Sequence, residues 1–528
     1  MNTIQPAAMK KQHDHISSVH AEEARDHQHM QDKETAAYAG QETIYIDENT
    51  NKELFWTINK RVLVCMLGTY FCQSLDKGTL GFSSVMGIKT DANLVGNEYN
   101  WLGTILYMGV LVGEYPTNFL LQKLPVGKYL AANMFCWGVV VACSAATHDF
   151  KTLMVVRFLL GMFESCVQPA FIIMTSMWYT RREQAILTSL WYCMQGVVQM
   201  VGGIIAWGVS HYNIDGKDPR KPMKSWQLLF LVLGIATVFW ASLVSWYLPD
   251  SPMKAKCYNE NEKRLLIERV RANETGIQNK IFKRYQAIEA ITDPILWCYV
   301  MLQVLSTLII GGLGVFSNLI IASFGFDYLT TQLLNIAQGA VVVLVMVGGA
   351  WLATSTRQTT LVMHVWTIPP IIGTAVMYSI PPTPSTRIGL LVAFYCTQFF
   401  LGTGCLIFSL ISRNTAGQTK KSTTLSTTFL FWAAGNMAAP MVFQDSDAPR
   451  YRKGFTAHFC IYVLFNMTLV IMRIILMRRN KVKRAAAAAA PTLEGSSSDL
   501  NNVDDKITHE HAFEDLTDKE NPDFRYEF

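Results

Sequence analysis

Four charged residues stand inside two long apolar stretches of the sequence. Asp76 and Lys77 are neighbours in VLVCMLGTYFCQSLDKGTLGFSSVMGI, and Arg157 and Glu164 lie in VVRFLLGMFESCVQP. A charge near the centre of a bilayer costs at least about 2.5–3.5 kcal/mol on insertion scales, so such residues usually face a bundle interior or a water-filled cavity and usually have a function. These four residues are therefore the first candidates for a functional site.

The chemistry open to these four side chains is specific. A buried carboxylate can take up and release a proton near neutral pH, and a cation in a low-dielectric cavity attracts an anion. A substrate anion and the carboxylates compete for the same cations, so protonation of a carboxylate frees a cation to receive the substrate. The alternative, in which the charges only pair with each other to hold helices together, stays open at this point.

A fifth charge and several amides extend the candidate set. Glu114, in LVGEYPTN, is expected near mid-membrane depth, where a gating role and a purely structural pairing both remain open. The second half of the chain holds amides in place of charges, and of these we expect Asn318, Gln398 and Asn436 to bind substrate. The alternative for each is an interhelical hydrogen bond, which is the commoner role of a single buried amide.

The elements that must position these side chains are membrane-spanning helices. Half of the 528 residues are apolar, only 16% are charged, and the apolar residues are gathered in long blocks, which is typical of a membrane protein. A helix needs about 20 apolar residues to cross a bilayer. The predicted spans are 61–83, 101–122, 129–148, 152–174, 186–210, 226–248, 295–322, 332–354, 360–380, 388–411, 425–443 and 456–477. Arg157, Gly161 and Glu164 share one face of the fourth span because they follow the i, i+4, i+7 spacing.

Six spans, a long loop and six more spans predict an all-α integral membrane protein with two six-helix bundles, 56–248 and 294–478. Residues 249–293 form a charged central loop, and 1–55 and 479–528 are polar tails that we expect to be disordered. An even number of spans places both ends of the chain on one side, and the Lys/Arg bias of the loops favours the cytoplasm for that side. We expect a multi-pass protein of the plasma membrane.

Several classes of function have no basis in the sequence. It contains no P-loop, GxSxG, HExxH or cofactor fingerprint, so we expect neither an enzyme, nor an ATP-driven pump, nor a bound cofactor. The eleven cysteines form no CxxC pair, and the net charge of +5 does not favour nucleic acid as a partner. The histidine-rich stretch HDHISSVHAEEARDHQH is interpreted as a solvated tail rather than a metal site, and the sequon at Asn273 is expected to carry no glycan.

Motifs spread over both halves of the chain resemble those of one family. They are LDK, YPTNFLL, RFLLGMFES, MWYTRREQA, SWQLLFLVLGI, LPDSP, FGFDYLTTQLLNIAQG, RNTAGQTKKSTT, GNMAAP and DAPRYRKG, within roughly residues 55–480. In these motifs the chain resembles the fungal allantoate permease group, which belongs to the anion:cation symporters of the major facilitator superfamily.

The resemblance implies a fold and a set of roles. The fold is two six-helix bundles that rock around a central cavity, lined by the first and fourth helices of each half. The proton-handling acids would be Asp76 and Glu164, and the cations that face the anion would be Lys77 and Arg157. Many relatives have arginine where this chain has Lys77. Lysine cannot form a planar bidentate grip on a carboxylate, which implies a different anion or looser selectivity.

The function implied is proton-coupled uptake of a small organic anion across the lipid bilayer by a functional monomer. Allantoate or another ureido acid, a carboxylate vitamin and a monocarboxylate are the candidate substrates. Two alternatives remain open. One is a proton antiporter that exports a metabolite, and the other is a nutrient sensor that binds its ligand without transporting it.

Overall fold

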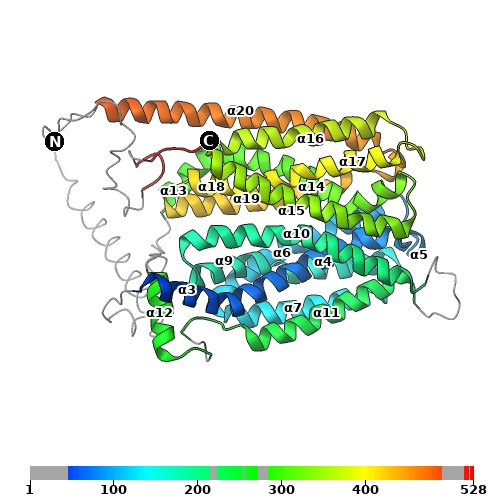
Figure 1. The fold of residues 1–528 in the computed structure, drawn as a ribbon, viewed down its shortest axis with the longest axis horizontal. Helices are drawn as coiled ribbons and strands as arrows, with labels where there is room; N and C mark the ends of the chain where they lie inside the picture. The colour runs from blue at the N-terminus through cyan, green and yellow to red at the C-terminus, as the bar shows by residue number, and fades with distance from the viewer. Residues whose placement is uncertain are drawn as a thin grey trace, which may run out of the picture.

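The computed structural model describes residues 46–213, 223–253, 255, 257–271, 283–489, 516–521 and 524–528. The histidine-rich stretch, the tail up to residue 45 and Asn273 lie outside the described residues. Within the described part of the chain every regular element is a helix, and Figure 1 shows these helices running nearly parallel in two groups, one from each half of the chain.

In the described residues of the first half, six long helical segments, called rods below, contribute to this arrangement, and two of the rods are interrupted. The first rod passes through a π-helical turn, and the fourth is broken between α8 and α9. Its elements are α3 (Glu48–Ile58), η1 (Asn59–Leu63), α4 (Val64–Ser84), α5 (Ile88–Asp91), α6 (Glu98–Lys123), α7 (Val126–Ser144), α8 (Phe150–Glu164), α9 (Val167–Trp178), α10 (Arg181–Ser210) and α11 (Ser225–Tyr247).

The connector and the second half follow the same plan. The described part of the connector contains two short helices, and the described part of the second half contributes six further rods. The connector helices are α12 (Glu260–Arg271) and α13 (Arg284–Thr292). The second half comprises α14 (Pro294–Ser323), α15 (Tyr328–Thr356), α16 (Thr359–Ser379), α17 (Arg387–Thr397), η4 (Gln398–Phe400), α18 (Leu401–Asn414), α19 (Gln418–Ala438), η5 (Ala439–Val442), η6 (Asp445–Asp447) and α20 (Arg452–Ala489).

Each predicted span coincides with one of these rods. Nine of the helical segments found in the described residues are long and apolar enough to cross a membrane. The other three predicted spans correspond to α4, α6 and α19. These helices are more polar because α4 carries Asp76 and Lys77, α6 carries Glu114, and α19 begins with a run of lysine and threonine. The all-helical membrane fold is confirmed, whereas a crossing by these three helices stays a prediction.

Close packing in the first half is made possible by glycine. Gly109 on α6 faces the backbone of α8 at Phe158, and Gly161 on α8 faces the backbone of α6 at Leu106. A Cβ atom on either glycine would overlap a carbonyl oxygen of the other helix. Small residues at these points let the two backbones approach each other, and this contact fixes the position of the α8 face that carries the charged residues.

The two halves meet along α10 and α15 and along α6 and α19. Hydrogen bonds join them at the end where α6 begins. Asn100 Nδ2 donates to the carbonyl oxygens of Pro440 at 2.9 Å and Phe443 at 2.5 Å, and Tyr99 donates to the carbonyl oxygen of Val315 at 3.1 Å. Thr104 donates to the carbonyl oxygen of Met437 at 2.8 Å. We call this end the latch side of the molecule.

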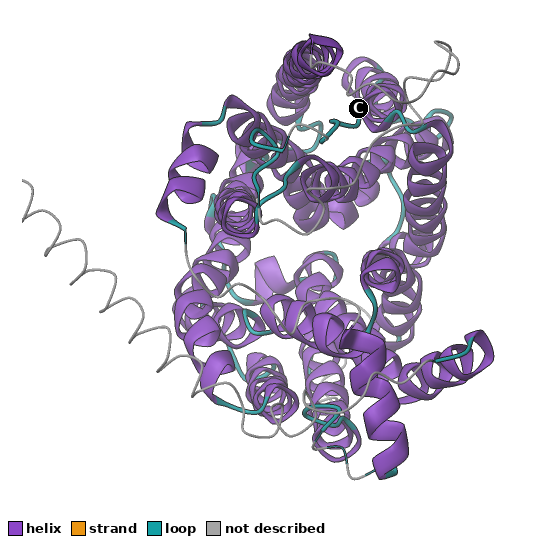
Figure 2. Cartoon of the chain, turned by 90° about the vertical axis from the view of Figure 1, so that its left-hand side faces the viewer, coloured by secondary structure: helices purple, strands orange, loops and turns teal. Residues whose placement is uncertain are grey.

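The other end of the molecule carries the first described helix, the connector helices and the C-terminal segment. Figure 1 shows α3, α12, α13 and the end of the chain together at its left, and Figure 2 views the helices from this direction. We call it the terminal side.

The structure differs from the prediction of two disordered tails. Helix α3 begins at Glu48, and α20 continues to Ala489 through the alanine run, because alanine has the highest intrinsic helix propensity. In the C-terminal tail, Thr517 and Tyr526 are buried. Both are covered by contacts with the second half of the chain, which sequence composition alone did not reveal.

Candidate substrate cavity

A cavity of about 250 Å³ lies between the two halves. Its lining residues come from α4, α6, α8, α9 and α10 of the first half and from α14, α15, α18 and α19 of the second. Ligand pockets usually have about 300–1,000 Å³, so a cavity of this size lies near their lower limit and suits a small ligand.

Charged residues line one wall of the cavity. Lys77 Nζ lies 3.5 Å from Glu164 Oε2, and their side chains are 28% and 0% exposed. This separation is longer than an ideal charge-assisted hydrogen bond of about 2.8 Å. Lys77 is therefore the cation that reaches into the cavity, and Glu164 is the buried anion that holds it.

Arg157 lies on the same wall and is buried more deeply. Its Nη2 donates to Thr79 Oγ1 at 3.4 Å, a long hydrogen bond, and its guanidinium carbon is 5.5 Å from the centre of the Phe230 ring. Arg157 contributes to the cavity lining although it is only 3% exposed. Of the four charged residues expected around the cavity, Lys77, Arg157 and Glu164 belong to its lining.

Asp76 does not line the cavity with them. It is fully buried, and its Oδ2 accepts hydrogen bonds from Trp137 Nε1 at 2.9 Å and Thr237 Oγ1 at 3.0 Å. These partners belong to α7 and α11, behind the cavity wall. Because successive residues of an α-helix point about 100° apart, Asp76 and Lys77 face different neighbours.

The predicted amides separate into two groups. Asn436 lines the cavity, and its Nδ2 donates to the carbonyl oxygen of Trp432 at 2.9 Å. Asn318 Oδ1 instead accepts from Asn335 Nδ2 at 2.8 Å, and Gln398 donates to the adjacent Thr397 hydroxyl at 3.3 Å. Asn318 and Gln398 do not belong to the cavity lining.

Glu114 contributes to the cavity lining from α6. Its side chain is half-buried. No ion pair of Glu114 is found among the described residues. The position of Glu114 therefore agrees better with a residue that faces the cavity than with one that holds two helices together.

Sequence reasoning missed several polar residues of the cavity, because in the first half it considered charges alone and in the second half it selected other amides. Tyr192, Gln195 and Gln199 on α10 line the cavity, and Gln195 Nε2 donates to the Tyr70 hydroxyl at 3.2 Å. Their i, i+3, i+7 spacing on an otherwise apolar helix was the available signal. Gln303 on α14 also lines the cavity, and its Oε1 accepts no hydrogen bond among the described residues.

Aromatic residues line the side of the cavity contributed by the second half. Trp432 and Phe429 of α19 stack with ring centres 4.9 Å apart and planes at 21°. Tyr107 of α6 meets Trp432 edge to face at 5.9 Å. The cavity therefore combines the cations of the first half with flat rings and amides from both halves, which suits a small anion with a planar or polar body.

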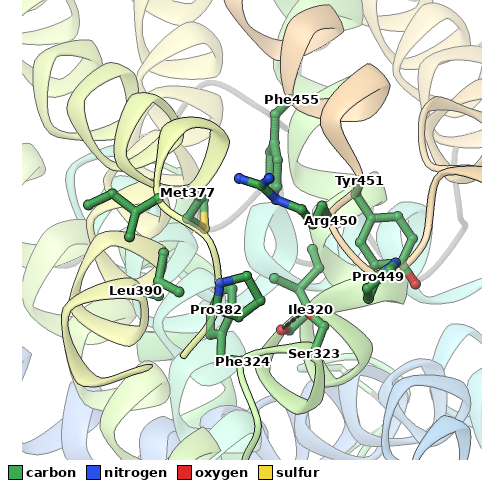
Figure 3. A pocket seen from close by; sticks show the side chains of 11 residues that line it. Ile320, Ser323, Phe324, Met377, Pro382, Leu390, Pro449, Arg450, Tyr451 and Phe455 are labelled. Atoms are coloured by element: carbon green, nitrogen blue, oxygen red, sulfur yellow. Dashed lines mark hydrogen bonds between the residues drawn. The ribbon is translucent and has the colours of Figure 1, made fainter. Parts of the chain in front are cut away.

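A second, much smaller cavity of about 10 Å³ lies on the latch side of the second half. Figure 3 shows Arg450, Tyr451 and Phe455 around it, with Pro382 below them. The Nη2 of Arg450 donates to the carbonyl oxygen of Tyr378 at 3.3 Å. This space is about the volume needed for one water molecule, so it is too small for an organic substrate.

Comparison with known proteins adds independent information. The model of the Major Facilitator Superfamily matches residues 66–440. An uncharacterized transporter of Schizosaccharomyces pombe is 34% identical over 501 residues, which cover 93% of this chain and 91% of that protein. The allantoate permease of Saccharomyces cerevisiae is 30% identical over 492 residues, which cover 92% of this chain and 88% of that protein.

A solved structure shares the fold at low sequence identity. The crystal structure of a D-xylose-proton symporter gives a TM-score of 0.57 with 12% identity and covers 78% of this chain and 96% of that one. This similarity shows a shared fold, and the family model and the sequence relatives confirm the family resemblance that the motifs predicted.

Proposed function

The chain belongs to the Major Facilitator Superfamily, and we propose that it is a secondary transporter that takes up a small organic anion together with a proton. The observation that carries this proposal is the pair formed by Lys77 and Glu164 on the cavity wall. Lys77 is partly exposed, and the ion pair found for it among the described residues is with Glu164, a fully buried carboxylate that can exist protonated or ionised.

The coupling we propose is a competition for one cation. When Glu164 is ionised it holds Lys77, and an entering carboxylate has to displace it. When Glu164 is protonated, Lys77 is free to bind the substrate carboxylate, and Arg157 adds a second positive charge on the same wall. Substrate and proton thus favour each other's binding, which is the thermodynamic requirement for symport.

We assign Asp76 a different part in the cycle. It lies behind the wall, where the Trp137 and Thr237 side chains donate to one of its oxygens, and it touches no cavity space. Its ionisation would act on the position of α4 relative to α7 and α11 rather than on the substrate itself. Glu114, half-buried at the cavity edge, is proposed as a gating residue.

The substrate class follows from the two sides of the cavity. A single carboxylate suits the Lys77 side, and a planar or hydrogen-bonding body suits Trp432, Asn436 and Gln303. Allantoate or another ureido acid, a carboxylate vitamin and a monocarboxylate all have this form. The name of the allantoate permease relative supports the first of these.

We propose that the terminal side faces the cytoplasm, that the protein resides in the plasma membrane, and that it works as a monomer. The inter-half hydrogen bonds of Asn100, Thr104 and Tyr99 lie on the latch side. With that side held together, the cavity would be reached from the terminal side, so the structure represents an inward-open stage of the cycle under this orientation.

Uptake into intact cells that express the protein tests this proposal against its rivals. Symport requires that uptake of a panel of labelled anions rises as external pH falls and collapses when an uncoupler is added. Export that speeds up as the outside is acidified would indicate the antiporter. Saturable binding without any flux would indicate the sensor.

A further inference from the structure

The last residues of the chain form a segment that lies across the terminal side of the second half. We name residues 516–521 and 524–528 the C-terminal strap. Figure 1 shows this segment in red, next to α13 and the ends of α16 and α18, and Figure 2 shows the end of the chain among the helices of the second half.

A cluster of buried charges anchors the beginning of the strap. Asp518 Oδ1 lies 2.6 Å from Lys420 Nζ at the start of α19, and the two side chains are 2% and 3% exposed. Lys420 Nζ also lies 2.9 Å from Glu289 on α13 and 3.3 Å from Asp293. Lys519 Nζ lies 3.3 Å from Asp293. Charges buried to this degree are tolerated only when they are paired, so strap and bundle complete one another's ion pairs.

Two asparagine side chains of the second half form hydrogen bonds with the backbone of the strap. Asn480 on α20 donates to the carbonyl oxygen of Tyr526 at 2.8 Å and accepts from its N–H at 2.9 Å. Asn414 on α18 does the same for Glu527, at 2.9 Å and 2.7 Å. Each amide thereby imitates the pairing of a neighbouring β-strand and fixes the register of the strap residue by residue.

Side chains of the strap add specificity to this backbone recognition. Tyr526 is 3% exposed, and its hydroxyl donates to Asp518 Oδ2 at 2.7 Å. Glu527 pairs with Arg413 at 2.9 Å. The centre of the Phe528 ring lies 5.4 Å from the guanidinium carbon of Arg473. The carbonyl oxygen of Phe528 accepts a hydrogen bond from the backbone N–H of Thr359.

From these contacts we infer that the terminal side of the second half is a peptide-binding surface, and that its ligand is the chain's own strap, bound within the same molecule. The surface offers the cations Lys420, Arg479 and Arg413, and the strap brings Asp518 and Glu527 to them. Because the strap is tethered through residues 490–515, its binding is intramolecular and gains from a high effective concentration. The fitting ligand is an acidic peptide with an aromatic residue between its two acids.

Hydrogen–deuterium exchange on the full-length protein tests this inference. The N–H groups of Tyr526 and Glu527 should exchange at least tenfold more slowly than in an isolated peptide of residues 516–528, because Asn480 and Asn414 accept from them. Asp518→Ala should abolish most of this protection, whereas Lys481→Ala on the exposed face of α20 should leave it unchanged. Exchange in the wild-type chain as fast as in the free peptide would overturn the inference, and so would full protection in Asp518→Ala.

Two further arms identify the occupant of the surface. An excess of an isotopically distinguishable peptide of residues 516–528 should speed exchange in the tethered strap, whereas the Tyr526→Ala version of that peptide should not. Protection should be the same over a fiftyfold range of protein concentration. Protection that is lost on dilution would mean that a second copy supplies the strap, and displacement by the Tyr526→Ala peptide would mean that the surface does not recognise this sequence.

Discussion

At the scale of single residues, the side chains of the neighbours Asp76 and Lys77 point in different directions. Lys77 reaches the cavity, and Asp76 turns to α7 and α11. Sequence reasoning found both residues because a charge in an apolar stretch is conspicuous. It did not separate their surroundings, because the direction of a side chain depends on which helices pack against each face.

Substitution of Lys77 tests its assignment to the substrate. Lys77→Ala should raise the apparent KM for the transported anion at least tenfold, because it removes the cation on the exposed part of the wall. The Lys77→Arg variant should still transport anions, and its substrate preference should shift toward planar carboxylates, because a guanidinium group binds a carboxylate through two parallel hydrogen bonds. Competition among unlabelled anions in cells expressing each variant measures both effects, and an unchanged KM in Lys77→Ala would remove this lysine from the substrate site.

Asp76→Asn tests the role of the buried acid. The asparagine oxygen can still accept from Trp137 and Thr237, so the fold should be kept while the site loses its ionisable group. Accumulation of the anion against its gradient should be lost, and exchange of labelled for unlabelled anion should continue. Uphill accumulation at the wild-type rate in this variant is the result that contradicts the assignment.

At the scale of elements, the sequence predicted helices well and contacts poorly. Each expected span coincides with a rod, because about 20 apolar residues in a row are a local signal. The ordering of the strap, the pairing of Asn318 with Asn335 and the isolation of Gln398 from the cavity depend on partners far away in the chain. No local pattern of residues encodes them.

The approach of α6 to α8 provides a test of how the charged wall is positioned. Gly161→Ala should destabilise the protein by about 1–3 kcal/mol, as overpacking of a tight site usually does, because the added Cβ meets the backbone of Leu106. Gly208→Ala is the matched control on α10, since nothing lies within 4 Å of a Cβ there. Thermal unfolding in detergent should separate the two variants, and equal melting temperatures would show that α6 and α8 do not pack this way.

The start of α14 gives a pH prediction outside the membrane. Burial alone would raise the pKa of Asp293, but hydrogen bonds from Arg479 and from the N–H of Ile295, with the charges of Arg479 and Lys420, lower that pKa from 3.8 to about 2. Glu289 and Asp518, which share Lys420, and Lys519 are further charged groups of this cluster. A carboxyl group whose pKa is lower in the folded chain than in the unfolded chain stabilises the fold at pH values above the unfolded pKa. This stabilisation is lost as pH falls through about 2.

Asp293→Asn should therefore lower the melting temperature by a similar amount at every pH between 5 and 8. The difference from the wild-type chain should shrink only below about pH 4. Thermal unfolding across this pH range measures it, and a difference that already disappears between pH 7 and 5 would show that Asp293 is not held ionised by these partners.

At the scale of the whole molecule, one cavity lies between two bundles that are joined by hydrogen bonds on the latch side. The charged residues of the lining come from the first half, whereas aromatic rings and amides come from both halves. Relative motion of the two bundles is the transport step of this superfamily. The proposed coupling requires that the substrate and Glu164 compete for Lys77.

Binding of the transported anion as a function of pH tests this claim most directly. The measurement uses purified protein and an anion from the uptake panel that stays fully ionised from pH 5.5 to 8.5. In the wild-type protein, affinity for the anion should fall with rising pH, by up to tenfold per pH unit for one proton, because ionised Glu164 competes with the anion for Lys77. In Glu164→Gln, affinity should be high and independent of pH. An equally steep fall in affinity in Glu164→Gln would contradict the competition.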